Sequence, residues 1–324
     1  MGRELQSMKK YIVTTTINPP TDAVYKFLSR TDWHMIVVGD TKTPHDEFRK
    51  LELQFPNLTY MDCELQDKMY PDLSAVIGWK SIRRRNIGFV AAYNSGADII
   101  ATIDDDNIPY QCWGEKLYVG HDIQEVEIYD CVTSVFDPLS ATNNNHLWHR
   151  GFPIQLIDKK NDIKLMGRNY TYIDVQADLW DGDPDIDAFE RIAWKPCVKF
   201  TVETPYMGRA ISPFNSQNTF LSRDCFPDYC VLPFVGRMDD IFGSYILQAK
   251  NPDINVVYNK ASVYQSRNAQ NLVTNLREEY IGYEHCLDFV ERMVKNGGDI
   301  KDNGGILPKE SVEFYKIYQK AFKV

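Results

Sequence analysis

The chain has little cysteine chemistry and no long apolar run. Its seven cysteines are odd in number and lack the Cys-x-x-Cys spacing of a zinc site, so neither a disulfide framework nor structural zinc is favoured. No apolar run approaches the roughly 20 residues that a membrane span needs. Residues 1–10 also lack the apolar segment of a secretory signal. We therefore expect a cytoplasmic protein in a reducing compartment, with no transmembrane segment.

An excess of positive charge is also absent. The chain carries 36 Lys and Arg against 45 Asp and Glu, a formal net charge of -9. Nucleic acids and anionic membranes are bound by neutralising phosphates, so this balance argues against both as partners. With 324 residues, 44% of them hydrophobic, the chain has the composition of one globular α/β unit.

Three adjacent carboxylates are the most informative feature that the sequence does contain. The apolar, β-branched residues 99–103 predict a buried strand, and Asp104, Asp105 and Asp106 follow it directly. Neighbouring anions repel each other beside a core unless a cation or hydrogen-bond donors offset them. Mg²⁺ or Mn²⁺ suits such oxygen ligands and keeps positions open for substrate phosphates. The alternative is an exposed Asx-type turn.

Cations precede these acids. Residues 79–95 have helical spacing, with Lys80, Arg83, Arg84 and Arg85 in the first turns, and Gly96 ends the segment. A helix that leads into a strand is typical of α/β folds, where ligands bind beyond the carboxyl ends of the strands. Arginine and lysine at this edge suit a diphosphate, although a solvated helix face accounts equally well for at least one of Arg83 to Arg85.

The N-terminal segments predict the start of a parallel sheet. Residues 11–16, 33–38 and 57–62 have strand character, and residues 21–29 form a short helix between the first two. Thr14, Thr15, Thr16, Asn18 and Asp40 would then lie at the same edge as the three acids. The threonines are equally well explained as ordinary strand residues.

These features together resemble the nucleotide-sugar site of GT-A glycosyltransferases, in particular the STELLO-type group and the related plant reversibly glycosylated polypeptides, the UDP-arabinopyranose mutases. Further matching segments occur in the family's order at residues 11–18, 150–153, 181–188, 213–219, 237–240 and 275–280. The resemblance implies an α/β, GT-A-like (Rossmann-like) fold with a mixed, mostly parallel sheet flanked by helices. It implies a catalytic domain at residues 1–285, followed by a C-terminal helical extension at residues 286–324.

The resemblance also implies site residues. For the nucleotide sugar these are Thr14, Thr16, Asn18, Asp40, Lys80, Arg84, Asn86, Asp104, Asp105, Arg150, Asp183 and Asn218. For Mn²⁺ or Mg²⁺ they are Asp104, Asp106 and Gln265, where Gln265 stands at a place where a histidine would be expected. A glutamine can still offer a carbonyl oxygen to a hard cation. Asp185 is a further candidate for the active-site lining.

Asp239 and Asp240 are the candidate catalytic residues. They precede the apolar helical segment 241–249, where the helix dipole favours carboxylates, so one of them is equally well explained as a cap. In an inverting transferase one acid acts as general base on the acceptor hydroxyl. In a retaining enzyme the same residue would only position the acceptor.

We therefore expect transfer of a sugar from a nucleotide diphosphate sugar, with UDP-sugar as the favoured donor, to an unknown glycan or other acceptor. One rival is a UDP-sugar mutase, disfavoured because Ile157 stands where the mutases have the sugar-carrying arginine. A second rival is a non-catalytic scaffold in a glycan-synthesis complex.

Two remaining regions carry weaker predictions. Residues 110–235 look irregular and aromatic, and their tryptophans either lie in the core or face a sugar, namely Trp113, Trp148, Trp180 and Trp194. Residues 276–295 and 309–323 predict amphipathic helices that either pack on the sheet or form a homo-oligomer contact.

Overall fold

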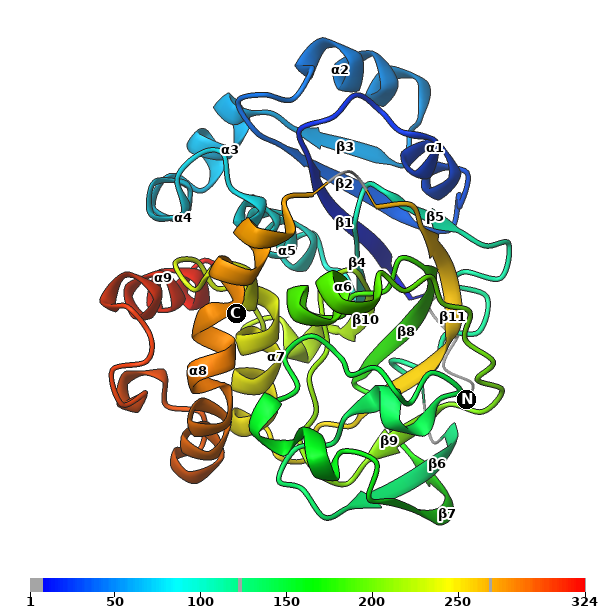
Figure 1. The fold of residues 1–324 in the computed structure, drawn as a ribbon. Helices are drawn as coiled ribbons and strands as arrows, with labels where there is room; N and C mark the ends of the chain where they lie inside the picture. Colours follow the sequence, from blue (N-terminus) through cyan, green and yellow to red (C-terminus); the bar gives the residue numbers. More distant parts are fainter. Residues whose placement is uncertain (1–7, 122–123, 268–269, 324) are drawn as a thin grey trace, which may run out of the picture.

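A single twisted sheet organises the protein, with helices on both of its faces (Figure 1). The computed structural model describes residues 8–121, 124–267 and 270–323. Within these residues the sheet has 11 strands in the order β3-β2-β1-β4-β10-β8-β11-β9-β6-β7, and β5 pairs with β11 beside this path. The predicted α/β fold, with a mixed sheet flanked by helices, is confirmed.

The strands alternate with helices in the first third of the chain and become the main element of the middle. The strands are β1 Lys10–Thr16, β2 His34–Gly39, β3 Leu58–Met61, β4 Ile99–Ile103, β5 Asn107–Pro109, β6 Gln124–Cys131, β7 Ile163–Thr171, β8 Val175–Gly182, β9 Tyr206–Gly208, β10 Asn218–Ser222 and β11 Val256–Gln265. The α-helices are α1 Asp22–Leu28, α2 His45–Gln54, α3 Cys63–Met69, α4 Pro71–Ile77, α5 Arg85–Asn94, α6 Ala188–Trp194, α7 Asp239–Lys250, α8 Leu272–Asn296 and α9 Lys309–Lys320.

The N-terminal strands β1 to β4 pair in parallel, as expected. Because β1, β2 and β4 run in the same direction, the segments that follow them emerge at one edge of the sheet. Thr16, Asp40 and Asp104 therefore end up at the same edge, which is where the sequence predicted them.

Alternate residues of these strands enter two separate cores. Ile36 and Val38 of β2 pack in the core that also holds residues of α5, α7, α8 and α9, whereas Met35 and Val37 pack in the core under α1 and α2. Successive side chains of a strand point to opposite faces, so a run of apolar residues is needed when both faces are covered. This explains why β2 reads as a continuous apolar segment.

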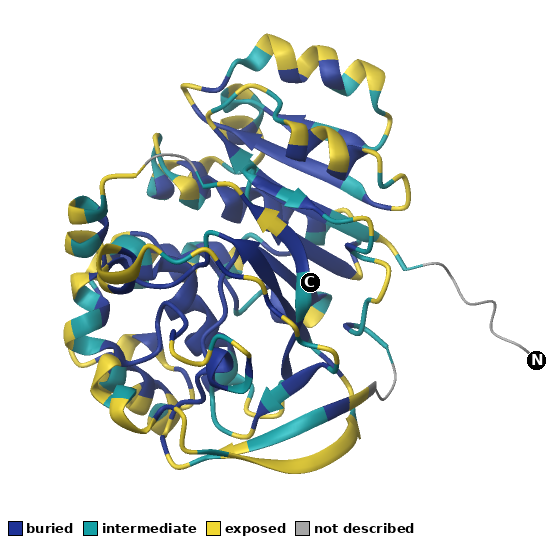
Figure 2. Cartoon of the chain, turned by 45° about the vertical axis from the view of Figure 1, so that its right-hand side comes forward, coloured by how far each residue is buried: buried dark blue, intermediate teal, exposed yellow. Residues whose placement is uncertain are grey.

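The middle of the chain is less irregular than predicted. β10 runs antiparallel between β4 and β8, which joins the parallel N-terminal strands to the rest of the sheet. β6 and β7 pair antiparallel at the far end of the sheet, although residues 132–162 lie between them in the chain, and β7 is almost entirely exposed (Figure 2). β7 is exposed and β8 is buried along nearly the whole strand, so neither shows the alternation of apolar and polar residues that predicts a strand, which is why the sequence did not reveal them.

The predicted helix at residues 79–95 begins later than expected. Gly78 and Lys80 both have left-handed backbone angles, with φ of 68° and 61°, and residues 82–84 form a 3₁₀ turn before α5 starts at Arg85. The tighter turn changes the direction of each side chain relative to an α-helix. Arg83, Arg84 and Arg85 therefore point to different surroundings.

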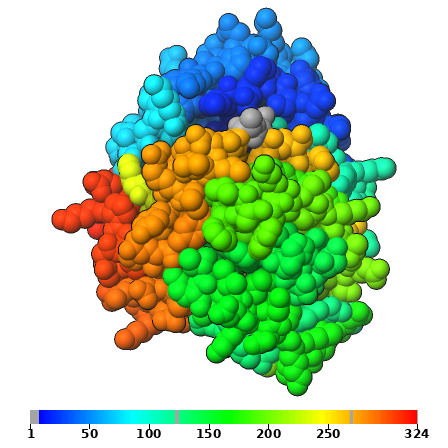
Figure 3. Space-filling model, in the orientation of Figure 1, coloured from blue at the N-terminus to red at the C-terminus, as the bar shows by residue number. Residues whose placement is uncertain are grey.

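The two predicted C-terminal helices are present as α8 and α9, and both contribute to the core that contains α5. The start of α8, in orange, lies between the blue N-terminal residues and the green middle of the chain in the space-filling view (Figure 3). The domain boundary expected at residue 285 falls inside α8, so the division into two units stays a prediction. Among the described residues no helix is both long and apolar enough to cross a membrane.

Candidate active site

Two adjoining cavities lie at the carboxyl ends of the parallel strands. The main cavity has a volume of about 290 Å³, and the adjoining cavity has a volume of about 300 Å³. Both are lined by Thr15, Ile82 and Asp105, so they share a wall. Together they form an extended site along the edge where the sequence predicted ligand binding.

The three adjacent acids have three different environments. The Asp104 carboxylate pairs with Arg85, and the Asp105 carboxylate accepts hydrogen bonds from the Thr16 hydroxyl and the Asn18 amide. Asp106 Oδ1 is buried and has no hydrogen-bond partner within the described part of the chain. Burial, followed by repulsion from Asp104, raises the pKa of Asp106 to about 7. Of the three, Asp106 has an acceptor that still needs a partner.

The residues present fit a hard divalent cation. Asp104, Asp106 and Gln265 all line the main cavity, and Asp106 Oδ1 is an orphaned buried acceptor. Residues 8–121, 124–267 and 270–323 contain no cluster of three or more His, Cys, Asp or Glu side chains arranged for a metal. Mg²⁺ typically binds through one or two carboxylates plus substrate phosphates, which agrees with this incomplete set. The Gln265 carbonyl accepts a hydrogen bond of 2.8 Å from Arg267, so its part in metal binding stays a prediction.

The three arginines that precede the acids in the sequence, Arg83 to Arg85, do not share one environment. Arg83 and Arg85 line the main cavity. Arg84 lines neither cavity: it is fully buried, stacks on the Trp79 ring at 3.6 Å and donates to Gln66 and Ser74. The sequence selected Arg84 as a ligand, and the structure instead places its two neighbours at the site. The 3₁₀ turn at residues 82–84 explains why Arg83 and Arg85, and not Arg84, line the main cavity.

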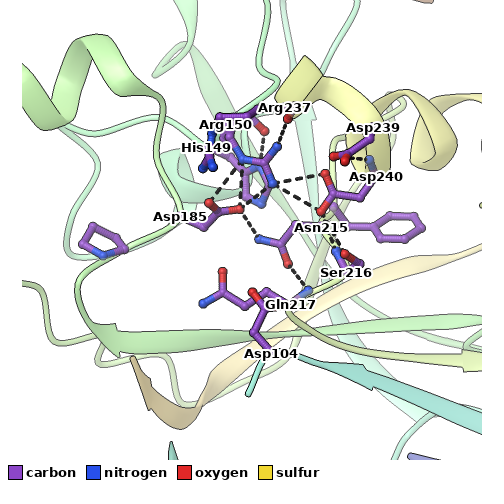
Figure 4. A network of polar contacts seen from close by, with 12 residues as sticks. Asp104, His149, Arg150, Asp185, Asn215, Ser216, Gln217, Arg237, Asp239 and Asp240 are labelled. Atoms are coloured by element: carbon purple, nitrogen blue, oxygen red, sulfur yellow. Dashed lines mark hydrogen bonds and ion pairs between the residues drawn. The ribbon is translucent and has the colours of Figure 1, made fainter. Parts of the chain in front are cut away.

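Arg150 lies at the centre of a buried polar network (Figure 4). Its guanidinium donates to the Asp185 carboxylate at 3.0 and 3.2 Å and to the Asp240 carboxylate at 3.1 and 3.2 Å. It also donates to the backbone carbonyl of Arg237. The Arg150 side chain is 7% exposed, and neighbouring Asp185 and Asp240 hold its pKa well above the usual value despite burial. Such a closely paired buried triad fixes the geometry of this wall.

Asp239 and Asp240 differ in how far they are already bonded. Asp240 accepts from Arg150 and from both the backbone N–H and the hydroxyl of Ser216, at 2.9 and 3.1 Å. Asp239 also lines the main cavity, and its carboxylate lies 2.9 Å from Arg83 Nε. Burial raises the pKa of Asp239, the Arg83 charge opposes this shift, and nearby Asp240 adds to it.

The adjoining cavity is lined by four residues selected from the sequence in addition to Asp105: Thr16, Asn18, Asp40 and Lys80. The other four selected residues besides Arg84 line neither cavity. Thr14 donates to the Ile103 carbonyl, Asn86 bonds the backbone of Val231, Asp183 pairs with Arg191, and Asn218 is buried against Trp113. These four tie together the segments that carry the site.

Several lining residues were missed by sequence reasoning. The main cavity also contains Ser216, Gln217, Arg237, Arg267, Gln270 and Glu278. Five of these fall in the segments that carried the resemblance or in the stretch around Gln265, so a signal existed for them, whereas Gln270 had none. The predicted tryptophans line neither cavity: Trp113, Trp148 and Trp180 are buried in the core, and Trp194 is 51% exposed.

Comparisons with known proteins give a limited result. No protein-family model and no curated protein matches the chain. A mycobacterial protein of solved structure shares 11% identity over 92% of this chain and 77% of its own, with a TM-score of 0.44. Glucosyl-3-phosphoglycerate synthase from Mycobacterium tuberculosis, in complex with phosphoglyceric acid, shares 13% identity over 92% of this chain and 82% of its own, with a TM-score of 0.43.

The same synthase in complex with Mn²⁺, uridine-diphosphate-glucose and phosphoglyceric acid shares 14% identity over 92% and 82% of the two chains, with a TM-score of 0.42. Because these TM-scores lie below 0.5, neither the activity nor the site residues of those proteins transfer to this chain. The resemblance to the STELLO-type group and the reversibly glycosylated polypeptides therefore stays a prediction.

Proposed function

We propose that the protein is a metal-dependent, GT-A-type glycosyltransferase that moves a hexosyl or pentosyl group from a nucleotide diphosphate sugar, with a UDP-sugar as donor, to an acceptor hydroxyl. One observation carries this proposal. Asp104 and Asp106 line the same cavity as Arg83, Arg85, Arg150, Arg237 and Arg267, at the carboxyl ends of parallel strands. Carboxylates for a cation and guanidiniums for phosphates are the groups that a metal-bound diphosphate requires.

The donor occupies both cavities in this proposal. The nucleoside lies in the adjoining cavity and the diphosphate in the main cavity, beside Asp104, Asp106 and Arg85. A divalent ion held there stabilises the charge of the diphosphate leaving group as a Lewis acid. Arg267 supports the same end of the site, because it lines the main cavity and forms only long ion pairs, of 3.8 and 3.5 Å, with Asp183 and Asp185.

Asp239 is the proposed general base for an inverting transfer. A carboxylate with a raised pKa accepts a proton more readily near neutral pH, whereas Asp240 is already engaged by Arg150 and Ser216. The acceptor oxygen forms a bond to the sugar C1 while the bond from C1 to the diphosphate oxygen breaks. The acceptor proton passes to Asp239. In a retaining transfer Asp239 positions the acceptor instead.

Ile157 supports transfer over mutase activity. It packs against the main hydrophobic core and has no group that could carry a sugar covalently. A mutase of the related family would need the arginine that this position lacks, so we do not favour ring interconversion.

The proposal is tested by melting temperature against a panel of nucleotides and nucleotide sugars, with and without Mn²⁺. A ligand at 100 times its dissociation constant stabilises the folded state by about 2.7 kcal/mol, which is measurable as a shift. We expect a Mn²⁺-dependent shift with one nucleotide family, lost in the Asp104→Ala/Asp106→Ala double variant. No shift with any nucleotide would contradict the proposal and favour a scaffold role.

A further inference from the structure

The Asp40 carboxylate is occupied by its own protein. Its Oδ1 accepts the Lys80 backbone N–H at 2.9 Å and both the N–H and the hydroxyl of Thr41, and its Oδ2 accepts the Ser81 N–H at 2.9 Å. The residue is 2% exposed. These backbone hydrogen bonds outweigh burial and hold the pKa of Asp40 below its usual value, so the carboxylate is charged. Few of its lone pairs remain for a ligand.

Lys80 has a backbone conformation that needs such support. Its φ is 61°, in the left-handed region that non-glycine residues rarely adopt. A residue held there is strained unless its surroundings stabilise that conformation. The two successive N–H groups of Lys80 and Ser81 converge on the two oxygens of Asp40, a contact that extended backbone at Lys80 would not make. Asp40 is therefore the group that holds this turn in place.

The turn determines what faces the adjoining cavity. Lys80, Ser81 and Asp40 all line it, together with Lys42 and Asp105. Asp105 Oδ2 already accepts hydrogen bonds from Thr16 and Asn18. Residues 8–121, 124–267 and 270–323 provide no ion-pair partner for either Lys80 or Lys42. The free charged donors of this cavity are thus ammonium groups, which suit an anionic or hydroxyl-rich ligand.

We propose that Asp40 is a positioning residue that holds Lys80 in its left-handed conformation, and that Lys80, not Asp40, contacts the nucleotide. This inference rests on the proposed function, because it assigns the contact within the nucleotide-binding cavity. It also changes the role that the sequence suggested for Asp40, from a ligand of the base or ribose to a clamp on the neighbouring turn.

A double-mutant cycle tests the inference, with UDP plus Mn²⁺ as the probe and calorimetric dissociation constants as the readout. Lys80→Ala in the wild-type background should weaken UDP binding about tenfold, the effect of losing a charged hydrogen bond. In the Asp40→Ala background the same substitution should change the constant less than twofold, because Lys80 has already lost its position. Lys42→Ala is the matched control, since Lys42 lines the same cavity without a bond to the Asp40 carboxylate. Its effect should be equal in both backgrounds.

A second measurement needs no ligand. Lys80→Gly should melt at a higher temperature than Lys80→Ala, because glycine adopts this backbone angle without strain. With Asp40→Ala present, residue 80 is free to relax and the difference should vanish. An unchanged difference would overturn the clamp, and so would equal losses of UDP binding from Lys80→Ala in both backgrounds. A Lys80→Ala variant that binds UDP as tightly as wild type would overturn the assigned contact. If wild-type protein binds no nucleotide at all, the proposed function fails, while the melting comparison still decides the clamp.

Discussion

The two walls of the main cavity are built differently. Under the proposed function one wall, the donor wall, comes from the end of β1, which contributes Thr15, and from the segment directly after β4, which contributes Asp104 to Asp106. Under the same proposal the other wall, the acceptor wall beside the candidate base Asp239, is assembled from distant parts of the chain, with Arg150 joined to Asp185 and Asp240 by hydrogen bonds across 35 and 90 residues (Figure 4). One wall is local in sequence, and the other depends on the whole fold.

The walls also differ in how far they are satisfied. The donor wall leaves Asp106 Oδ1 without a hydrogen-bond partner in the described residues, whereas Asp240 and Asp185 each accept several hydrogen bonds. Unsatisfied buried groups are expected where a ligand completes the site, and satisfied networks are expected where geometry must be rigid. Substitutions on the acceptor wall should therefore change stability first, and substitutions on the donor wall should change binding first.

The largest effect is expected for Arg150→Met. It leaves the buried Asp240 carboxylate without its ion-pair partner and Asp185 with only Arg267, at 3.5 Å, and breaking a buried ion pair in this way typically costs about 3 to 5 kcal/mol. Urea unfolding measures the loss. Arg168→Met is the matched control, because the Arg168 side chain is 51% exposed and pairs with Glu127. That control should lose at most about 1 kcal/mol. Equal losses in the two variants would mean that the network does not stabilise the acceptor wall.

The next effect is a pH dependence behind the acceptor wall. Glu190 is buried and accepts a hydrogen bond from the backbone N–H of Trp148. Burial, followed by repulsion from Asp187, raises the pKa of Glu190 to about 10. Since this folded-state pKa lies above the unfolded value, its contribution to stability is lost as pH rises from the unfolded pKa through the folded pKa.

Glu190→Gln keeps the acceptor for Trp148 and removes the titration. Between about pH 6.5 and 8.5 the free energy of unfolding of the variant should rise relative to that of wild type by roughly 1 kcal/mol per pH unit. Asp187, whose pKa is raised to about 6 by burial, has lost its proton over most of this range. Denaturation curves at both pH values give the comparison. If the difference in unfolding free energy between the variant and wild type does not change with pH, Glu190 is not a buried neutral acid.

A smaller effect separates two neighbours in the basic run. Arg84→Met should lower stability by about 1 to 3 kcal/mol, because Gln66 and Ser74 lose a charged donor. Its UDP dissociation constant should stay within twofold of the wild-type value. Arg85→Met should instead weaken UDP binding at least tenfold, because the Arg85 side chain, although only 1% exposed, lines the main cavity and holds Asp104 and Ser216 there. Comparable binding losses in both variants would contradict the division of this run between core and cavity.

The smallest effect is expected for Thr16→Val, which removes the hydroxyl that donates to Asp105. A single hydrogen bond contributes about 0.5 to 1.5 kcal/mol, and the expected loss of unfolding free energy lies in that range. A loss as large as that of Arg150→Met would mean that the donor wall is as tightly networked as the acceptor wall.

The same contrast explains what the sequence could predict. β1, β2 and β4 were found from apolar periodicity, and the edge that carries Thr16, Asp40 and Asp104 followed from parallel pairing. These are local signals. Arg84 was selected as a ligand, but Arg83 and Arg85 line the main cavity, because a 3₁₀ turn at residues 82–84 interrupts the helical spacing.

The sequence identified only some of the residues of the acceptor wall. Arg150, Asp185 and Asp240 were found through a resemblance, but their mutual contacts depend on tertiary packing that no periodicity encodes. Arg267 and Glu278 lie in segments for which the sequence carried a signal, but that signal did not single them out, because their place beside the site depends on the packing of β11 and α8. Only the structure reveals that Asp240 already accepts several hydrogen bonds, which separates its role from that of Asp239.

The most direct test of the central claim is calorimetric binding of UDP and of uridine, each with Mn²⁺ and with a chelator, to wild type and to Asp104→Asn/Asp106→Asn. If the acids hold a metal-bound diphosphate, UDP binding should require Mn²⁺ and be lost in the double variant. Uridine should bind more weakly than UDP. Neither removal of Mn²⁺ by the chelator nor the double substitution should change the affinity for uridine. UDP that binds equally well without metal, or to the double variant, would contradict the claim.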